Sequence, residues 1–161
     1  MKTLYLVRHA KASRDDPALA DRDRPLHDRG LNDAPAMARR VAKQRVKPAL
    51  LMSSPALRAL TTAQLFADEL GHSRRAIVID ERIYAATVDV LLALIHELDD
   101  DHDGVMLFGH NPEFSELAGH LAGKMIDMPT CAVARCRFDV ASWVDVNRSA
   151  LDRFSLDKPE H

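Results

Sequence analysis

Four residues could together bind and transfer a phosphoryl group: the adjacent pair Arg8 and His9, and the more distant Arg58 and His110. A guanidinium can hold two oxygens of a phosphate through parallel N–H groups. A neutral imidazole can attack phosphorus and form a phosphohistidine, which water later hydrolyses. Positive charge from Arg8 and Arg58 would disfavour the imidazolium and keep His9 nucleophilic near neutral pH. The four residues are therefore candidates for a phosphate pocket in which His9 is the nucleophile.

All four stand where the chain leaves a predicted strand or enters a predicted helix. Arg8 and His9 follow one apolar run, His110 follows another, and Arg58 lies in the first turn of a helix after a third. Short apolar runs without polar alternation are typical of strands buried in a parallel sheet. The carboxyl ends of such strands meet at one edge, beside helix amino termini, so the side chains should converge there. The runs are Leu4–Val7, Ala49–Met52 and Val105–Phe108.

The rest of the chain continues the alternation of strands and helices. Capping residues, prolines and apolar stripes predict helices from Asn32 or Asp33 to Gln44, from Pro55 to Leu70, from Val88 to Leu98, and from Pro112 to Gly123. A short strand is predicted at Ala76–Ile79, and Ala132–Val140 with Trp143–Val146 predicts a peripheral hairpin. We therefore expect an α/β fold, a three-layer sandwich with a mainly parallel sheet flanked by helices and a C-terminal hairpin at its edge.

The segment Lys11–Gly30 shows no period, and loops of this length usually serve a function or are mobile. Acidic and basic residues alternate loosely along it. The acidic residues are Asp15, Asp16, Asp21, Asp23 and Asp28.

Length and composition indicate an ordinary globular protein with one domain, residues 1–161. The 22 basic and 24 acidic residues nearly balance, so no overall field would gather nucleic acid or an anionic membrane. Arg8 ends the first apolar run too early for a signal peptide or membrane span, which favours a cytoplasmic location. Cys131 and Cys136 are five apart in one predicted strand, hence on opposite faces, so we expect two reduced thiols.

Four motifs, in order along most of the chain, resemble those of the histidine phosphatase superfamily, which includes the cofactor-dependent phosphoglycerate mutases. The most similar group is the short SixA-like phosphohistidine phosphatases. Arg-His alone means little in a chain with eight histidines, but four ordered motifs at strand ends and helix starts are specific. The motifs are Arg8-His9-Ala10-Lys11; Asp23-Arg24-Pro25-Leu26 with Arg29-Gly30; Ser53-Ser54-Pro55-Ala56-Leu57-Arg58; and Gly109-His110-Asn111-Pro112.

The resemblance implies a phosphoglycerate mutase-like fold, His9 as the phosphorylated nucleophile, and Arg8, Arg58 and His110 as the phosphate pocket. The chain departs from the commoner signature at Ala10 and Ala12, where Gly and a hydroxyl residue usually stand. Ser13 is a candidate to supply the missing hydroxyl contact to the substrate.

Glu81 resembles the glutamate that protonates the leaving oxygen in the mutases, and it is the candidate general acid. An alkoxide leaving group needs such an acid. The imidazole of a phosphohistidine can leave already protonated, so a SixA-like protein can manage without one. A solvated surface carboxylate is the other interpretation of Glu81.

Each of the other candidates also has a structural explanation. Arg8 and Arg58 could be ion-pair partners at the surface, and His110 could be a histidine hydrogen-bonded near a turn. Lys11 and Arg14 could either meet a phosphoprotein or face water. The remaining histidines show no metal-ligand spacing, and we predict no metal and no cofactor.

The sequence thus predicts a monomeric phosphatase whose substrate is a phosphohistidine on a protein, such as a phosphotransfer domain or phosphocarrier. The reason is length, since the chain has little to spare for an insertion that would roof the pocket over a small substrate. The alternative is a phosphomonoesterase, or a mutase, acting on small phosphate esters with Glu81 as the acid. A third hypothesis is a module that binds phosphorylated ligands without turning them over.

Overall fold

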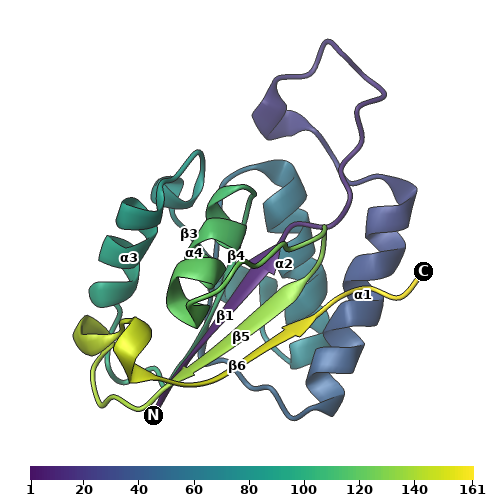
Figure 1. The fold of residues 1–161 in the computed structure, drawn as a ribbon. Helices are drawn as coiled ribbons and strands as arrows, with labels where there is room; N and C mark the ends of the chain where they lie inside the picture. Colours follow the sequence, from purple (N-terminus) through teal and green to yellow (C-terminus); the bar gives the residue numbers. More distant parts are fainter.

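The computed structural model describes residues 1–161 and contains one mixed sheet of six strands (Figure 1). The strand order is β3-β2-β4-β1-β5-β6. β1, β2, β3 and β4 run parallel, and β5 and β6 are added antiparallel at one side. The bounds are β1 Lys2–Arg8, β2 Leu50–Ser53, β3 Val78–Ile79, β4 Gly104–Gly109, β5 Val133–Phe138 and β6 Leu151–Asp157.

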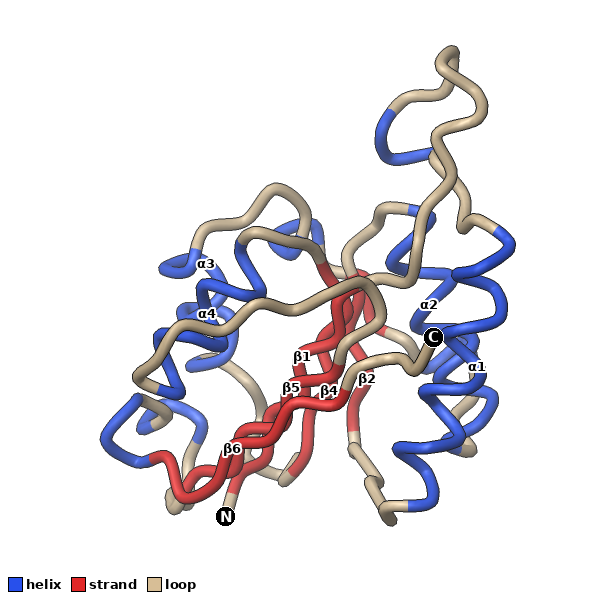
Figure 2. The backbone as a smooth tube through the Cα atoms, turned by 45° about the vertical axis from the view of Figure 1, so that its right-hand side comes forward, coloured by secondary structure: helices blue, strands red, loops and turns tan.

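Two helices cover each face of the sheet, so the predicted three-layer α/β sandwich is confirmed (Figure 2). α1 and α2 pack together on one face, and α3 and α4 pack together on the other. None of these helices has both the length and the apolar character needed to cross a membrane. The bounds are α1 Asp28–Lys43, α2 Leu57–Leu70, α3 Val88–His96 and α4 Glu113–Ala122.

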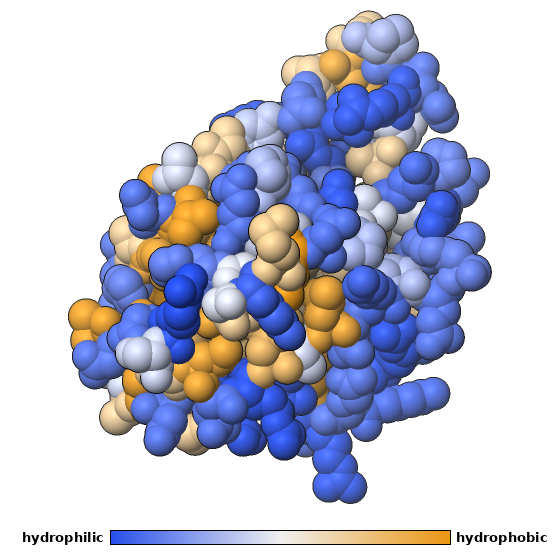
Figure 3. Space-filling model, in the orientation of Figure 1, coloured by the Kyte–Doolittle hydropathy of each residue, from blue (hydrophilic) through white to orange (hydrophobic).

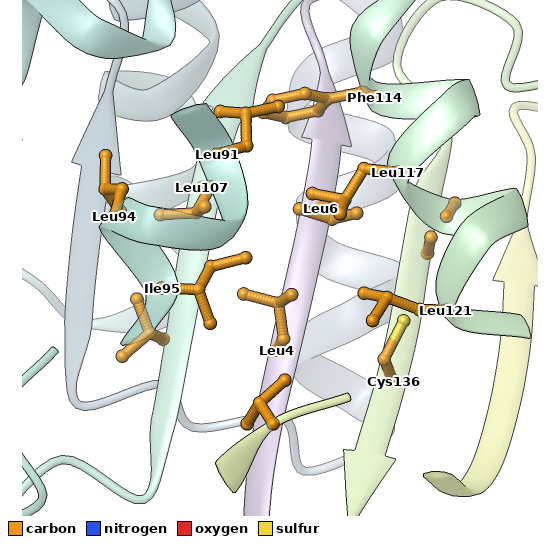
Figure 4. Close-up of a cluster of buried hydrophobic side chains, with 14 of the residues drawn as sticks. Leu4, Leu6, Leu91, Leu94, Ile95, Leu107, Phe114, Leu117, Leu121 and Cys136 are labelled. Carbon is orange, nitrogen blue, oxygen red and sulfur yellow. The ribbon is translucent and has the colours of Figure 1, made fainter. Parts of the chain in front are cut away.

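The buried strands supply side chains to two separate apolar clusters, one on each face. Leu4 and Leu6 of β1 face α3 and α4 (Figure 4). Tyr5 and Val7 belong to the other cluster, with residues of α1 and α2. This alternation explains why the strand sequence shows no polar period. The two cysteines also divide between the clusters, and both are free, as predicted. Burial raises the pKa of both thiols to about 12.

The predicted hairpin is present but its second strand was assigned wrongly. β5 pairs with β6 at Leu151–Asp157, and the predicted partner Trp143–Val146 forms a 3-10 turn over Trp143–Asp145 instead. Trp143 is fully buried in the cluster beneath α3 and α4, where its indole N–H donates to the carbonyl of His102. Burial of this large side chain overrides the strand propensity of its neighbours. β5 is also not at the edge, because it lies between β1 and β6.

The predicted helix starts were displaced in three cases. α1 begins at Asp28 with His27 as its cap, so Pro35 lies inside the helix and not in its first turn. α2 begins at Leu57, two residues after Pro55, and α4 begins at Glu113. Thr87 caps α3, where its hydroxyl oxygen accepts the N–H of Val90. The early start of α1 removes three residues from the Lys11–Gly30 loop.

Two glycines permit close backbone contacts beside the carboxyl ends of the strands. A Cβ on Gly30 would come within 2.3 Å of the carbonyl oxygen of Lys11, and one on Gly109 within 2.4 Å of the Phe114 ring. Gly30 thus lets the first turn of α1 press against the chain that has just left β1. No larger residue fits at either position without displacement of its neighbours.

We expect Gly30→Ala to destabilise the fold by about 1–3 kcal/mol, because its methyl group collides with backbone and not with a movable side chain. Urea unfolding followed by circular dichroism measures this change. Gly104→Ala is the matched control, since the nearest atom to its Cβ lies at 3.5 Å, an ordinary contact. Equal stability of Gly30→Ala and the parent would contradict the assignment of this contact.

Candidate active site

Parallel pairing of β1 with β4 brings the two candidate histidines together. Arg8 and Gly109 are register partners at the ends of these strands, and the N–H of His9 donates to the Gly109 carbonyl at 2.9 Å. The next residues, His9 and His110, leave the sheet side by side, with ring centroids 5.3 Å apart. Their exposed fractions are only 9% and 6%. A separation of 101 positions in the sequence is therefore closed by the register of two strands.

The two arginines approach from different elements. Arg58 lies in the first turn of α2 and is 7% exposed. Thr62, one turn later, donates its hydroxyl hydrogen to the Arg58 carbonyl and accepts the N–H of Ala10, which ties α2 to the residue after His9. Arg8 is partly exposed, and its Nη1 donates to the carbonyl of Met128 at 3.0 Å.

His9 is held as a neutral ring with a defined proton position. Its Nδ1 lies 2.7 Å from the carbonyl of Ala10, which can only accept a hydrogen bond, so Nδ1 carries the proton and Nε2 keeps its lone pair. The pKa of His9 is lowered to about 3. Burial is the largest cause, and the charges of Arg58 and Arg8 add smaller contributions in the same direction. The arginines assist neutrality, as the sequence suggested, but burial dominates it.

His110 is neutral for the same reason, since burial lowers its pKa to about 4. Its Nε2 lies 2.8 Å from the hydroxyl of Ser54. Because that oxygen already accepts the N–H of Ala56, its own hydrogen is free to bond Nε2, an arrangement that puts the ring proton of His110 on Nδ1. The sequence favours Ser54 as the cap of the next helix, but α2 begins at Leu57 after Ala56, and the Ser54 hydroxyl orients a site histidine instead.

Two polar atoms of the site have no partner within the chain. Arg8 Nε and His110 Nδ1 are the only buried side-chain nitrogen or oxygen atoms without a hydrogen bond. A buried unpaired donor costs about 1–3 kcal/mol, so it usually marks a place where a ligand is expected to bind. Both atoms belong to the same four-residue group, and an N–H at each would suit the oxygens of a tetrahedral anion.

The structure separates the remaining candidates from this group. Glu81 is an exposed carboxylate whose hydrogen bonds go to Arg22, at 2.7 and 3.4 Å, and to none of the four residues. The hydroxyl of Ser13 accepts the N–H of Asp15 in a local turn. No group of three or more His, Cys, Asp or Glu side chains is placed to hold a metal ion.

Sequence reasoning missed two residues that contact the site. Asp21 accepts two hydrogen bonds from Arg58, one through its carbonyl and one through its carboxylate. The Tyr84 ring lies edge-on to His110, with centroids 5.6 Å apart. Asp21 was one of five acidic residues in an aperiodic loop, and nothing in the sequence distinguished it except its position three residues before Arg24. The motif residue Asp23 makes no such contact.

The chain is similar to known proteins in both sequence and fold. The family model described as the histidine phosphatase superfamily (branch 1) matches residues 4–84. An uncharacterised chloroplastic protein of Arabidopsis thaliana is 30% identical over 150 residues, which cover 88% of this chain and 69% of that protein.

Solved structures with a similar fold include members with different substrates. The provisionally assigned phosphohistidine phosphatase SixA of Agrobacterium tumefaciens is 30% identical, with a TM-score of 0.79 over 85% of this chain and 92% of that one. A mycobacterial glucosyl-3-phosphoglycerate phosphatase is 17% identical, with a TM-score of 0.64 over 98% of both chains, and this likeness concerns the fold alone.

Because His9 and His110 are neutral in the folded protein, we expect the free energy of unfolding to decrease as the pH drops below 7. The unfolded chain takes up protons near the ordinary histidine pKa of 6.5, whereas folded His9 and His110 do so only near 3 and 4. Stability is therefore lost as the pH falls from about 6.5 toward the folded values, by about 2 kcal/mol for each histidine between pH 7 and 5.

Urea unfolding at pH 7 and pH 5 measures this loss, and His9→Gln should reduce it by about 2 kcal/mol. The exposed His120→Ala is a control for the effect of removing a histidine. A parent and a His9→Gln variant that lose equal stability between the two pH values would show that His9 is protonated in the folded protein.

Proposed function

The chain belongs to the histidine phosphatase superfamily (branch 1), and from this premise we propose that His9 accepts the phosphoryl group and that Arg8, Arg58 and His110 bind it. One observation carries this assignment: the only two unpaired buried side-chain donors in the chain, on Arg8 and His110, lie beside a neutral, oriented His9. Donors already in place at a dry site stabilise charge without reorganising during the reaction.

The proposed reaction has two steps. The lone pair of His9 Nε2 attacks phosphorus, the bond from phosphorus to the leaving group breaks, and a phosphohistidine forms on the protein. Water then attacks the same phosphorus, releases inorganic phosphate, and returns His9 to its neutral form. Arg8, Arg58 and the Nδ1–H of His110 hold the phosphoryl oxygens in both steps. The Ala10 carbonyl accepts a hydrogen bond from the Nδ1–H of His9 and stabilises the positive charge that develops on the His9 ring.

The favoured substrate is a phosphohistidine on a protein, such as a phosphotransfer domain or phosphocarrier of the cytoplasm. Its imidazole can leave already protonated, so no general acid is needed. The placement of Glu81 supports this choice, because its hydrogen bonds go to Arg22 and not to the four residues. The similarity to the Agrobacterium protein supports it as well. We propose that the enzyme acts as a monomer.

The alternative is hydrolysis of small phosphate esters with Glu81 as the acid. One contact favours it: Arg22, the ion-pair partner of Glu81, lies over the Tyr84 ring, which itself touches His110. The contacts from Glu81 through Arg22 and Tyr84 thus end at His110. A module that only binds phosphorylated ligands accounts less well for a neutral His9 with a free Nε2.

We expect the purified protein to release phosphate from a histidine-phosphorylated carrier protein, and His9→Ala to lose this activity by at least about 10⁴-fold. A rapid quench at alkaline pH should trap an acid-labile phosphoenzyme in the parent only. His120→Ala, an exposed histidine on α4, is the matched control and should keep parental rates. Activity in His9→Ala equal to that of the parent would show that His9 is not the nucleophile. Phosphate binding by the parent without any phosphoenzyme would favour a binding module.

Glu81→Gln separates the two substrate classes. We expect phosphohistidine turnover to change by less than about fivefold, since an exposed ion pair contributes at most about 1 kcal/mol. Glu97→Gln, which breaks the exposed pair with Arg82, is the matched control. If p-nitrophenyl phosphate is the better substrate and its hydrolysis falls by about 100-fold or more in Glu81→Gln, the small-ester function should replace the protein substrate.

A further inference from the structure

We propose that Asp21 is a positioning residue, which fixes the orientation of the Arg58 guanidinium toward the phosphoryl group. This inference rests on the proposed function and adds a residue outside the four. Asp21 lies in the 3-10 turn Asp21–Asp23 of the segment that projects from the body of the molecule (Figure 1). The surface of this segment is largely hydrophilic (Figure 3). Asp21 nevertheless bonds the buried Arg58.

Arg58 donates two hydrogen bonds to Asp21. Nη1 of Arg58 donates to the Asp21 carbonyl at 2.7 Å, and Nη2 donates to the Asp21 carboxylate at 3.0 Å. Bonds from both terminal nitrogens define the plane and rotation of the guanidinium, which a single bond would not. A guanidinium has five N–H donors, so three remain after these two bonds to hold phosphoryl oxygens.

The same carboxylate also bonds the residue that packs against His110. The Tyr84 hydroxyl donates to Oδ2 of Asp21 at 2.5 Å, while the Tyr84 ring lies edge-on to His110. Asp21 is thereby connected to two members of the proposed phosphate pocket, to Arg58 directly and to His110 through one aromatic ring.

Asp21 is itself fixed, which is what a positioning role requires. Arg24 donates to its other oxygen at 3.1 Å, and the Nε of Arg24 donates to the Ser13 carbonyl, which anchors the turn to the start of the loop. Bonds from Tyr84, Arg58 and Arg24 hold the pKa of Asp21 well below its usual range, so it stays a carboxylate. If Asp21 instead occupied the phosphate position in the free protein, its bonds with Tyr84, Arg58 and Arg24 would have to break each time substrate bound.

An arginine displaced by about 1 Å from a transferring phosphoryl group can cost about 100-fold in rate. Asp21→Ala removes the carboxylate that holds Nη2 of Arg58 and leaves only the bond from Nη1 to the main-chain carbonyl, so the guanidinium becomes free to rotate. We therefore expect Asp21→Ala to lower kcat/KM by about 100-fold and Asp21→Asn, which retains an acceptor oxygen, by about 10-fold.

The test measures phosphohistidine turnover and the Kd of orthovanadate, by calorimetry, in the parent, Asp21→Ala and Asp21→Asn. Both the KM and the vanadate Kd should rise in the order parent, Asn, Ala. Loss of folded protein alone would lower apparent kcat and leave these two constants unchanged. Asp23→Asn, in the same turn but without a bond to the site, is the matched control and should behave as the parent.

A double-mutant cycle with Arg58→Ala identifies the route of the effect. If Asp21 acts by orienting Arg58, Asp21→Ala should change the vanadate Kd by less than about threefold once Arg58 is absent. The full effect of Asp21→Ala in the Arg58→Ala background would overturn the inference, as would tighter vanadate binding in Asp21→Ala, which would identify Asp21 as a plug. A parent that binds vanadate but turns over no phosphohistidine would contradict the proposed function while the cycle still decides the role of Asp21.

Discussion

The register between β1 and β4 is the constraint on which the rest of the site depends. These parallel strands end level with each other at Arg8 and Gly109, so the next residue of each strand is a histidine at the same edge of the sheet. A slip of one residue would turn one ring to the opposite face. The apolar side chains of both strands, packed on both faces, hold that register, and the core therefore determines the distance between His9 and His110.

Burial then gives these histidines their chemical state. Moving an imidazole out of water disfavours its charged form, and this effect exceeds that of the neighbouring arginines at both positions. The free-energy cost of burying these polar rings is partly offset, because each ring retains one hydrogen bond. His9 bonds the Ala10 carbonyl, and His110 bonds the Ser54 hydroxyl. The proton positions that follow suit the two proposed roles, a lone pair on His9 for attack and an N–H on His110 for binding.

The site combines rigid and exposed parts of the molecule. Arg8, His9 and His110 come from strand ends and Arg58 from a helix start, all anchored in the sandwich. The segment before α1, by contrast, projects from the body of the molecule, and it reaches the site through the hydrogen bonds of Asp21 with Arg58. The contacts of Asp21 thus add a second layer around the four residues.

The sequence by itself determined the α/β class, the strand ends and the four proposed site residues, because buried parallel strands and their turns leave local patterns that need no partner to be recognised. It did not determine that Trp143 would be buried and β6 would follow at Leu151, nor that α1 would begin at Asp28. Those outcomes depend on how helices, strands and loops distant in the sequence pack against one another. Only the tertiary structure distinguished Asp21 from Asp23 and placed Glu81 on Arg22, because a charged residue in an aperiodic loop carries no local signal of its partner. Hydrogen bonds between residues 37 or 59 positions apart exist only once the chain has folded.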